Sequence, residues 1–449
     1  MEALKRAIKS PPKIVVLGGG FGGLETAKHL RRLARSGRAH VRLISDSEAF
    51  VFTPFLCEVA GGSIELRHVV QSIREMVVPW GVGFTQARVE GLEPDSRLVL
   101  TDRGPMVFDY LVVGLGSAVN FFGVGGAREH CLTLHKLADA QRLRSRLGAT
   151  LEEAAASRDS GQERPIRCAV IGAGPTGVEL VCELADMLRE VLPRCYPELP
   201  AEAVELTLLE ASDNILGIYH PDLQKYAEER IASKGVRLVK GAKVERVGQE
   251  EVHLADGEVL PCDIAVWTAG IQPNPVLKTM GLPLTEIGYL RVEPTLQVPG
   301  HPNVYGLGDC TSFLSETDGK SLPAEAQVAV QQAQCIARNL AAELEGRPLE
   351  TFRYHHFGRL ISLGTRYAVT DFMRVRFSGF VGWWLWRTIY LVKLRRAKNI
   401  LRVMLDWTID LFFGRELYRL PGIEAEARRV EDEESLGVTS EVSPRMLHE

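Results

Sequence analysis

The feature that most constrains this chain is a strand, a glycine-rich turn, a helix and a second strand, an order that occurs twice. In the first copy, residues 13–18 (KIVVLG) predict a buried strand, residues 24–36 (LETAKHLRRLARS) a helix and residues 41–45 (VRLIS) the next strand. In the second copy, the same segments are residues 166–172 (IRCAVIG), 178–192 (VELVCELADMLREVL) and 204–210 (VELTLLE). This order opens a doubly wound sheet. We therefore predict an α/β chain with two Rossmann-like dinucleotide-binding domains.

The first turn carries glycines at the spacing of a dinucleotide-binding fingerprint. Gly18 permits the tight turn, Gly20 lets the backbone approach a pyrophosphate, and Gly23 lets the helix pack against the strand. The pyrophosphate then lies at the helix N-terminus, where free N–H groups and the helix dipole favour an anion. Phe21 and Gly22 lie between these glycines and belong to the same predicted site.

The second turn carries the same fingerprint in Gly172, Gly174 and Gly177, with Pro175 and Thr176 between them. Glu210 closes the strand that follows the helix. An acid at this position accepts hydrogen bonds from the adenosine ribose hydroxyls and repels a 2′-phosphate, which favours NADH over NADPH. The alternative is a strand-end carboxylate that is only solvated.

Composition argues against several classes of protein. The net charge of −4 argues against a nucleic-acid partner, and 45% apolar with 24% charged residues is ordinary for an α/β protein. None of the eight cysteines forms a CxxC pair or a metal-ligand cluster, so we expect reduced, buried thiols and no metal site. Residues 1–13 (MEALKRAIKSPPK) lack the apolar core of a signal peptide. No stretch longer than 18 residues is free of charge, so we expect no spanning helix.

Beyond the fingerprints, three segments give the chain a resemblance to the two-dinucleotide-binding-domain flavoproteins. They are residues 303–309 (NVYGLGD), 110–116 (YLVVGLG) and 267–270 (WTAG). The resemblance implies that the first fingerprint binds FAD and the second binds NADH. It also implies that Asp309 holds the ribityl chain of the flavin, that Gly116 lies at the FAD site and that Gly270 lies at the NADH site.

Four further segments are similar to the type II NADH:quinone oxidoreductases within that superfamily. They are residues 52–60 (FTPFLCEVA), 326–332 (AQVAVQQ), 377–380 (FSGF) and 405–413 (LDWTIDLFF). The resemblance runs from residue 13 to residue 420. It implies a non-proton-pumping enzyme that passes hydride from NADH to FAD and then two electrons to a membrane quinone. Pro54 belongs to the segment that runs along the flavin in that family.

One position departs from the family pattern. The family usually has an acid at the end of the first domain's second strand, where this chain has Ser45, with Asp46 one residue later. Successive residues of a strand point to opposite faces. Either the strand ends early and Asp46 turns towards the FAD ribose, which we favour, or Ser45 makes a weaker contact with that ribose.

Three side chains are candidates for the chemistry. Residues 324–341 predict a helix, in which Gln327 and Gln331 are four residues apart and share a face. Neutral amides can orient a quinone carbonyl without bringing a charge into an apolar pocket, and Gln327 is also a candidate FAD contact. Glu179 lies near the nicotinamide and the flavin in the resembled family, and a buried carboxyl there would have a raised pKa suited to proton transfer. The alternatives are solvated glutamines, and a glutamate that only satisfies the N-terminus of its helix.

The segment from residue 376 to residue 407 predicts attachment to a membrane surface. Up to residue 405 it has no acid and seven basic residues, Arg376, Arg387, Lys393, Arg395, Arg396, Lys398 and Arg402. Four of the six tryptophans of the chain lie in it, at Trp383, Trp384, Trp386 and Trp407. Since tryptophan favours the bilayer interface and basic residues favour anionic headgroups, we expect amphipathic helices that lie on anionic lipid at the cytoplasmic side of the cell inner membrane. The alternative is a buried helix or the face of a homodimer.

The predicted domains follow from these motifs. We place the FAD-binding domain at residues 10–148 and 286–375, with the NADH-binding domain inserted at residues 163–285. A small C-terminal module of membrane-binding helices follows at residues 376–420. An acidic tail at residues 421–449 is expected to be mobile.

Two other functions stay open for such a chain. A sulfide:quinone reductase is compatible with Ser45, Asp46 and the FTP triplet at residues 52–54. It needs a redox cysteine pair at the flavin, however, and no cysteine follows Cys335. A flavoprotein sensor or scaffold would bind the nucleotides without turnover. Oxidation of NADH by a quinone distinguishes the dehydrogenase from both.

Overall fold

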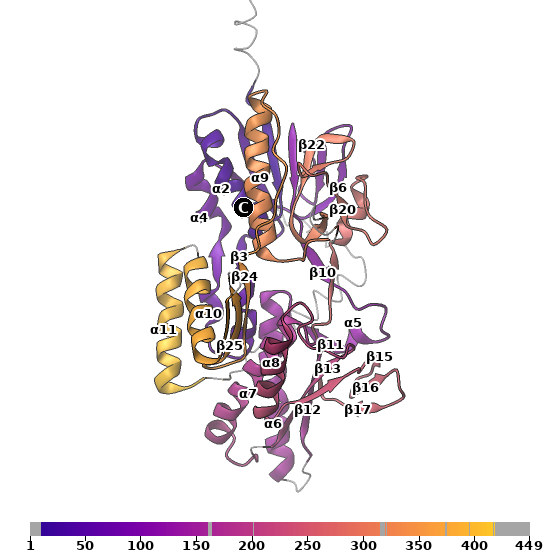
Figure 1. Ribbon diagram of the computed structural model, residues 1–449, viewed down its shortest axis with the longest axis vertical. Coiled ribbons are helices and arrows are strands. Elements are labelled where there is room, and N and C mark those ends of the chain that lie inside the picture. The colour runs from indigo at the N-terminus through magenta and orange to yellow at the C-terminus, as the bar shows by residue number, and fades with distance from the viewer. Residues whose placement is uncertain are drawn as a thin grey trace, which may run out of the picture.

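The computed structural model describes residues 10–159, 164–200, 202–314, 319, 321–372, 375–394, 396–415 and 417. The predicted acidic tail at residues 421–449 lies outside these residues. Two parallel sheets organise the chain, one in each half of the molecule along its long axis (Figure 1).

The first sheet has six strands in the order β21-β22-β9-β1-β2-β5. They are β1 (Lys13–Leu17), β2 (His40–Ser45), β5 (Gly83–Gln86), β9 (Tyr110–Val113), β21 (Gln297–Val298) and β22 (His301–Gly306). All neighbours are parallel except β21 and β22. Helices α2 (Phe21–Arg35) and α9 (Ala326–Leu344) lie side by side (Figure 1), because each turns an apolar stripe, with Leu30 and Leu340 among its members, into the same core.

The second sheet has five parallel strands in the order β11-β18-β12-β13-β14. They are β11 (Cys131–Thr133), β12 (Ile166–Ile171), β13 (Val204–Glu210), β14 (Arg237–Lys240) and β18 (Ile264–Trp267). Its helices are α6 (Leu137–Asp159), α7 (Pro175–Cys195) and α8 (Pro221–Ser233). Strand β18 is buried along its whole length, as a parallel strand covered on both faces should be.

Each parallel sheet is extended by a small antiparallel sheet at the same place in the chain order. Between β5 and β9 lie β6 (Val89–Glu93), β7 (Leu98–Thr101) and β8 (Met106–Val107). Between β14 and β18 lie β15 (Val244–Val247), β16 (Glu251–Leu254) and β17 (Val259–Pro261). The two domains therefore repeat one plan.

The remaining elements of these domains are short. They are β3 (Ala49–Val51), η1 (Thr53–Phe55), α3 (Leu56–Ala60), η2 (Leu66–His68), β4 (Val70–Ser72), α4 (Ile73–Val77), η3 (Val78–Trp80), α5 (Ala127–His130), η4 (Pro275–Thr279), β20 (Leu290–Arg291), η5 (Gly308–Cys310) and β23 (Thr311–Ser312). Strand β10 (Ser117–Val119) pairs with β19 (Ile271–Pro273), so the two connections between the sheets run antiparallel to each other. The second domain is thus inserted between β9 and β22 of the first.

The inserted domain begins earlier than the sequence predicts. Because β11 pairs with β18, residues 131–133 belong to the second sheet and not to the FAD-binding domain, so the predicted start at residue 163 is too late. Strand β11 has three half-buried residues and no apolar periodicity, so no pattern marks it in the sequence. Helix α6 packs on β11 and β12 and belongs to the inserted domain with them.

The C-terminal module consists of an antiparallel sheet and two helices. Its elements are β24 (Gly358–Ser362), β25 (Ala368–Phe372), β26 (Val375–Ser378), α10 (Gly379–Lys393) and α11 (Ala397–Phe413). The predicted start at residue 376 is too late, because β24 is paired with β25 and so belongs to the same unit. Helix α10 packs on β25, and α11 lies beyond it at the edge of the molecule (Figure 1). Within the described ranges, no helix combines the length and the apolar character needed to cross a membrane.

Candidate active site

The first glycine turn forms an open cradle ahead of α2. Gly18 has φ +101°, and a Cβ there would lie 2.1 Å from the carbonyl oxygen of Gly114. A Cβ on Gly23 would lie 1.9 Å from the carbonyl oxygen of Gly18. At Gly20, by contrast, no atom lies within 4 Å of a Cβ position, and no side chain caps the helix that begins there. The turn therefore leaves its N–H groups open to an anion, as a pyrophosphate requires.

The second glycine turn repeats this geometry ahead of α7. Gly172 has φ +104°, and a Cβ on Gly177 would lie 1.9 Å from the carbonyl oxygen of Gly172. The surroundings of Gly174 are open, and the N-terminus of α7 has no side-chain cap. Pro175 and Thr176 are exposed in the first turn of the helix. Both fingerprints thus fit a dinucleotide.

The strand ends beside the two turns differ. Leu17 pairs with Ile44 and Ile171 pairs with Leu209, so Ser45 and Glu210 occupy equivalent places. The Glu210 carboxylate accepts hydrogen bonds from the backbone N–H groups of Ala173, at 2.7 Å, and Ser212, at 2.9 Å. These bonds hold an acid against the second turn.

At the first turn, β2 continues through Ser45, whose hydroxyl accepts a hydrogen bond from the Ser47 N–H at 3.3 Å. Ser45 is buried, and a Cβ on Gly19 would lie 2.7 Å from its hydroxyl oxygen. Asp46 lies one residue later and is exposed. The register therefore gives Ser45, and not Asp46, the place that corresponds to Glu210.

The other predicted FAD contacts come from several elements around the first sheet. Gly22 lies in the first turn of α2, Gly116 in the turn after β9, Pro54 in η1 and Asp309 in η5. The Asp309 carboxylate accepts a hydrogen bond from the Ser117 hydroxyl at 3.5 Å. Burial raises the pKa of this carboxyl, and nearby His135 opposes the shift.

Aromatic rings and a second-domain glycine complete the surroundings of the two turns. Phe21, at the start of α2, packs edge-on against Phe50, with ring centroids 5.1 Å apart. Gly270 follows β18, and a Cβ there would lie 2.6 Å from the ring of Phe122. The absence of a side chain at Gly270 therefore lets Phe122 lie close to the backbone that follows β18.

Sequence reasoning missed the role of Gln332. This side chain is buried, and its carbonyl oxygen accepts a hydrogen bond from the Gly308 N–H at 2.7 Å. It therefore holds the loop that carries Asp309. Gln332 is the last residue of the AQVAVQQ segment, but the sequence alone does not distinguish its role from that of Gln331.

The two predicted quinone-site glutamines connect α9 to the start of the C-terminal module. The Gln331 amide exchanges two hydrogen bonds with the backbone of His355, both 2.9 Å long. The Gln327 amide donates to the Glu325 carboxylate and, at 3.3 Å, to the carbonyl oxygen of Gly358. The donors of both side chains therefore have partners within the chain.

Glu179 lies in the second turn of α7 and faces the C-terminal module. Its carboxylate accepts a hydrogen bond from the Ser362 N–H at 3.0 Å. Burial raises the pKa of Glu179 to about 8, and the neighbouring carboxylate of Glu183 adds to the shift while the Ser362 bond opposes it. The carboxyl thus has the raised pKa that the sequence predicts for a proton-transfer group.

Two more glutamates, which sequence reasoning did not single out, lie beside Glu179. We call the group the carboxyl cluster, and its members are Glu58, Glu179 and Glu183. Glu58 belongs to the FTPFLCEVA segment, but the sequence does not show that α3 brings this residue against α7. Two aromatic residues of α10, Trp386 and Tyr390, pack on Phe55 of the same segment.

Comparison with known proteins identifies the arrangement. The chain matches the pyridine nucleotide-disulphide oxidoreductase family over residues 12–333 and the NDH2 C-terminal domain over residues 356–416. The chain belongs to the type II NADH:quinone oxidoreductases. This membership confirms the predicted α/β fold, the enzyme class, FAD and NADH as the nucleotides, and a quinone as the acceptor.

Several relatives of this oxidoreductase match along nearly the whole chain. A probable NADH dehydrogenase of Dictyostelium discoideum is 30% identical over 418 residues, which cover 90% of each protein. The demethylphylloquinone reductase NdbB of Synechocystis is 31% identical over 406 residues, which cover 88% of this chain and 95% of the relative.

Two solved structures show the same fold. NDH2 from Plasmodium falciparum in complex with NADH superposes with a TM-score of 0.82 at 18% identity, covering 91% of this chain and 100% of that one. The sulfide:quinone oxidoreductase from Aquifex aeolicus gives a TM-score of 0.70 at 18% identity, covering 92% and 99%. All eight cysteines of this chain are described, and each is a free thiol.

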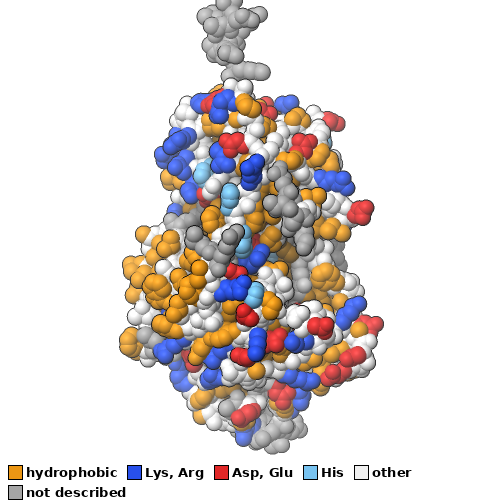
Figure 2. Space-filling view, viewed as in Figure 1, with side chains coloured by type: hydrophobic (Ala, Val, Ile, Leu, Met, Phe, Trp, Pro, Cys, Tyr) orange, Lys and Arg blue, Asp and Glu red, His pale blue; other side chains and the backbone are white. Residues whose placement is uncertain are grey.

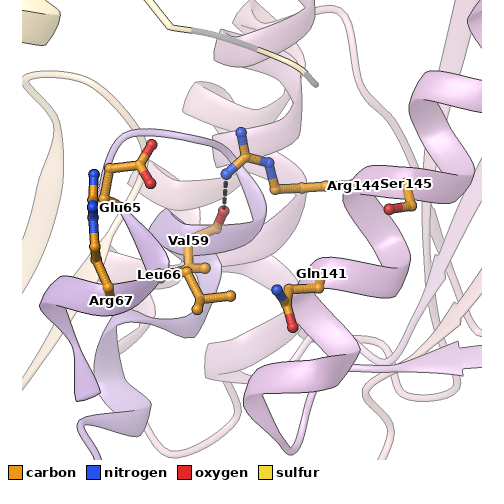
Figure 3. A pocket seen from close by; sticks show the side chains of 7 residues that line it. All are labelled: Val59, Glu65, Leu66, Arg67, Gln141, Arg144 and Ser145. Atoms are coloured by element: carbon orange, nitrogen blue, oxygen red, sulfur yellow. Dashed lines mark hydrogen bonds between the residues drawn. The ribbon is translucent and has the colours of Figure 1, made fainter. Parts of the chain in front are cut away.

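A cavity of about 150 Å³ lies between α3, η2 and α6, apart from both nucleotide turns (Figure 3). Its lining consists of Val59, Glu65, Leu66, Arg67, Gln141, Arg144 and Ser145. The Arg144 guanidinium donates to the carbonyl oxygen of Val59 at 3.4 Å. None of the predicted site residues lines this cavity, so it is not the place of the nucleotides.

Proposed function

We propose that this type II NADH:quinone oxidoreductase binds FAD at the first glycine turn and NADH at the second, and reduces a membrane quinone between α9 and α10. The observation that carries the proposal is the pair of open, uncapped helix N-termini, one beside each parallel sheet. Two such sites in one chain suit a reaction in which one dinucleotide is the cofactor and the other is the substrate. FAD, when bound, supplies the two-electron chemistry that links NADH to the quinone.

The residues around the two turns have separate tasks in this proposal. The N–H groups after Gly20 and Gly174 bind the two pyrophosphates. The Glu210 carboxylate accepts hydrogen bonds from the ribose hydroxyls of NADH. The Asp309 carboxylate accepts a hydrogen bond from a hydroxyl of the flavin's ribityl chain. Ser45 contacts the FAD ribose, because it occupies the place that corresponds to Glu210, while Asp46 stays the weaker candidate.

The assignment of the two glycine turns also gives roles to the other predicted site residues. Phe21, Gly22, Pro54 and Gly116 line the FAD site, and Gly270 borders the NADH site. Pro175 and Thr176 contact the second pyrophosphate from the exposed first turn of α7. Glu179 holds a proton for the quinone, for which a pKa near neutrality is suitable.

The quinone-site glutamines divide into two roles. Gln327 exchanges its 3.3 Å bond with the Gly358 carbonyl for a bond to the quinone carbonyl, since that bond is long for an N–H donor. Gln331 keeps its two bonds to His355 and so fixes the segment that leads into β24. Both roles leave the site free of added charge, which an apolar quinone requires.

The helices of the C-terminal module form the proposed membrane surface. Large apolar side chains are exposed on it, with Trp384 57%, Val392 76% and Phe412 74% exposed. Figure 2 shows hydrophobic side chains gathered over the position of α10 and α11. The Arg387 guanidinium lies over the rings of Trp383 and Trp407, 4.2 and 4.0 Å from their centroids, so it does not break the apolar surface. Of the basic residues predicted for this surface, Arg395 lies outside the described residues.

The proposed occupant of this surface is a bilayer with anionic lipid, at the cytoplasmic side of the cell inner membrane. Exposed tryptophan and phenylalanine together with Lys393, Lys398 and Arg402 suit the interface of such a bilayer. A homodimer through the same face is the alternative. Paired substitutions Phe412→Ser and Phe413→Ser should release the protein from anionic vesicles, whereas a change of sedimentation coefficient with unchanged vesicle binding would favour the homodimer.

The reaction itself is tested by the visible spectrum of the purified protein. NADH added without oxygen should bleach a flavin band, and a soluble quinone added next should restore it. Sulfide alone should leave the band unchanged, because NADH and not sulfide is the proposed electron donor. A band that NADH does not bleach would contradict the proposal and favour a nucleotide-binding protein without turnover.

A further inference from the structure

The carboxyl cluster forms where α3 lies along the first turns of α7. At one end of α3, the Cys57 thiol lies 3.6 Å from the carbonyl oxygen of Thr176. Past its other end, a Cβ on Gly61 would lie 2.9 Å from the Cβ of Glu183. Glu179 and Glu183 are four residues apart and share one face of α7. Glu58 follows Cys57 in α3, and its carboxyl lies close enough to the carboxylates of Glu183 and Glu179 for both to raise its pKa.

The three carboxyls have unequal partners. Glu183 is paired with the Arg415 guanidinium at 2.9 Å, and both side chains are almost fully buried. Glu179 accepts one backbone N–H, from Ser362. Glu58 is 2% exposed, and neither of its carboxyl oxygens has a hydrogen-bond partner. An ionised carboxylate in that position would be costly, so Glu58 is held as the neutral acid.

The electrostatics of the cluster agree with this assignment. Burial, followed by the carboxylates of Glu183 and Glu179, raises the pKa of Glu58 well above its ordinary value, and Arg415 opposes the shift only in part. The titratable groups around Glu58 and Glu179 are Cys57, Cys182, Glu183, Tyr219, Tyr390 and Arg415. Of these six, Arg415 alone is a cation, and its charge is matched by Glu183.

We propose that Glu58 is a proton store for quinone reduction, which holds one proton in the resting enzyme and passes it to Glu179. The inference rests on the proposed function, since it assigns a supporting residue to the same reaction. Glu58 does not contact the quinone in this proposal; it acts through Glu179 and is therefore a positioning residue. Burial raises the pKa of Glu183 as well, but Arg415, just beyond the membrane-facing helix α11, opposes that rise through the ion pair and so favours the stored proton on the other two carboxyls.

The proton balance of the reaction requires a second proton source, which the store supplies. A quinone takes up two electrons and two protons, and NADH supplies two electrons and one proton. In the proposed step, the O–H bond of Glu179 breaks as its proton joins a quinol oxygen. The O–H bond of Glu58 then breaks as its proton restores Glu179, and water reprotonates Glu58.

Solvent has a route towards this store. Val59, the residue after Glu58, lines the cavity between α3 and α6 together with Gln141 and Ser145 (Figure 3). With a volume of about 150 Å³ and several polar groups in its wall, the cavity can admit water, which needs about 30 Å³ per molecule. Water in this cavity would lie beside the turn of α3 that carries Glu58.

Infrared spectroscopy of the FAD-loaded protein tests the stored proton without turnover. At neutral pH, the oxidised enzyme should show the C=O stretch of protonated carboxyls, and this band should shift in heavy water. Glu58→Gln should remove the intensity of one carboxyl. Glu343→Gln is the matched control, because Glu343 is a partly buried carboxylate that already accepts a hydrogen bond from Tyr305 at 2.8 Å. An unchanged band in Glu58→Gln would show that Glu58 is ionised and would overturn the proposal.

Stopped-flow reduction of a soluble quinone distinguishes a proton store from a packing role. Glu58→Gln keeps the size of the side chain but cannot give up a proton, while Glu58→Asp keeps the proton and leaves a small void. We expect Gln to slow the quinone step on the order of tenfold, and Asp to retain more of the rate than Gln. A Gln variant that is faster than the Asp variant would assign Glu58 to packing and overturn the proposal.

The dependence on pH follows from the raised pKa of Glu179. Below about pH 8 this carboxyl holds its proton, and above it the proton is lost. The rate of the wild-type quinone step should therefore fall as the pH rises through about 8. A rate that rises over the same interval would contradict the relay. If NADH failed to bleach the wild-type flavin, the proposed function would fail, whereas the infrared result would still report the proton on Glu58.

Discussion

The two glycine turns have nearly the same backbone but different side chains at the end of the neighbouring strand. Gly18 and Gly172 have φ values of +101° and +104°, and in both turns the third glycine lies against the carbonyl of the first. Ser45 closes the strand beside the first turn, and Glu210 closes the strand beside the second. The shared backbone suits the pyrophosphate that all dinucleotides have, while the strand end distinguishes one nucleotide from another.

The largest effect is expected when the open middle glycine of either turn is filled. Gly20→Ala and Gly174→Ala place a methyl group where no protein atom lies within 4 Å, so the fold should be kept and only the pyrophosphate should be displaced. Gly20→Ala should lose FAD on purification. Gly174→Ala should keep FAD but be reduced by NADH roughly 100-fold more slowly, a cost of about 3 kcal/mol from overpacking.

Thermal unfolding checks that these two variants compare binding and not folding. The Tm of each apo variant should match that of the apo wild type. If Gly174→Ala lost the flavin and Gly20→Ala kept it, the assignment of the two turns would be reversed.

A smaller effect is expected when Glu210, beside the second glycine turn, is replaced by serine, the residue at the equivalent position beside the first turn. Glu210→Ser removes a carboxylate that repels a 2′-phosphate, and its neighbours Ala173 and Ser212 lose their acceptor. The preference for NADH over NADPH, measured as a ratio of kcat/KM values, should fall by roughly 30-fold, or about 2 kcal/mol. Glu205→Ser, an exposed change on the same strand, should leave the ratio unchanged. Equal use of the two cofactors by the wild type would remove the role given to Glu210.

The smallest effect is expected at the first strand end. Ser45→Ala removes one neutral hydrogen-bonding group, worth about 1 kcal/mol, so FAD affinity should fall roughly fivefold. Asp46→Ala should change the affinity less, because Asp46 is exposed and one residue beyond the equivalent of Glu210. Flavin release measured by fluorescence distinguishes them, and a larger loss in Asp46→Ala would restore the assignment first made from the sequence.

The sequence predicts those parts of the fold that have local patterns. Strands β1, β12 and β13 are mostly apolar segments closed by glycine or acid, and they agree with the predicted segments to within one residue. The glycine fingerprints were assigned correctly to the ends of two sheets because their spacing has a direct geometric cause. Helix α9 was also expected, two residues early at its start and three at its end.

Features that depend on distant partners were not predictable from one sequence. Strand β11 exists only because it pairs with β18, more than a hundred residues later, and β24 begins the C-terminal module only through its pairing with β25. The importance of Glu58 depends on the packing of α3 along α7, and no pattern in the sequence shows that packing. Arg415 reaches Glu183 across 232 residues, a contact for which no local pattern exists.

The central claim, that one turn holds the cofactor and the other the substrate, is tested most directly by hydrogen exchange. The FAD-loaded protein should be exchanged with and without saturating NAD⁺, and protection should be read by mass spectrometry in peptides that cover the two turns. We expect NAD⁺ to protect the amides of residues 172–178 and to leave those of residues 18–24 unchanged, because FAD already covers them. Protection of residues 18–24 by NAD⁺, with none at residues 172–178, would contradict the account.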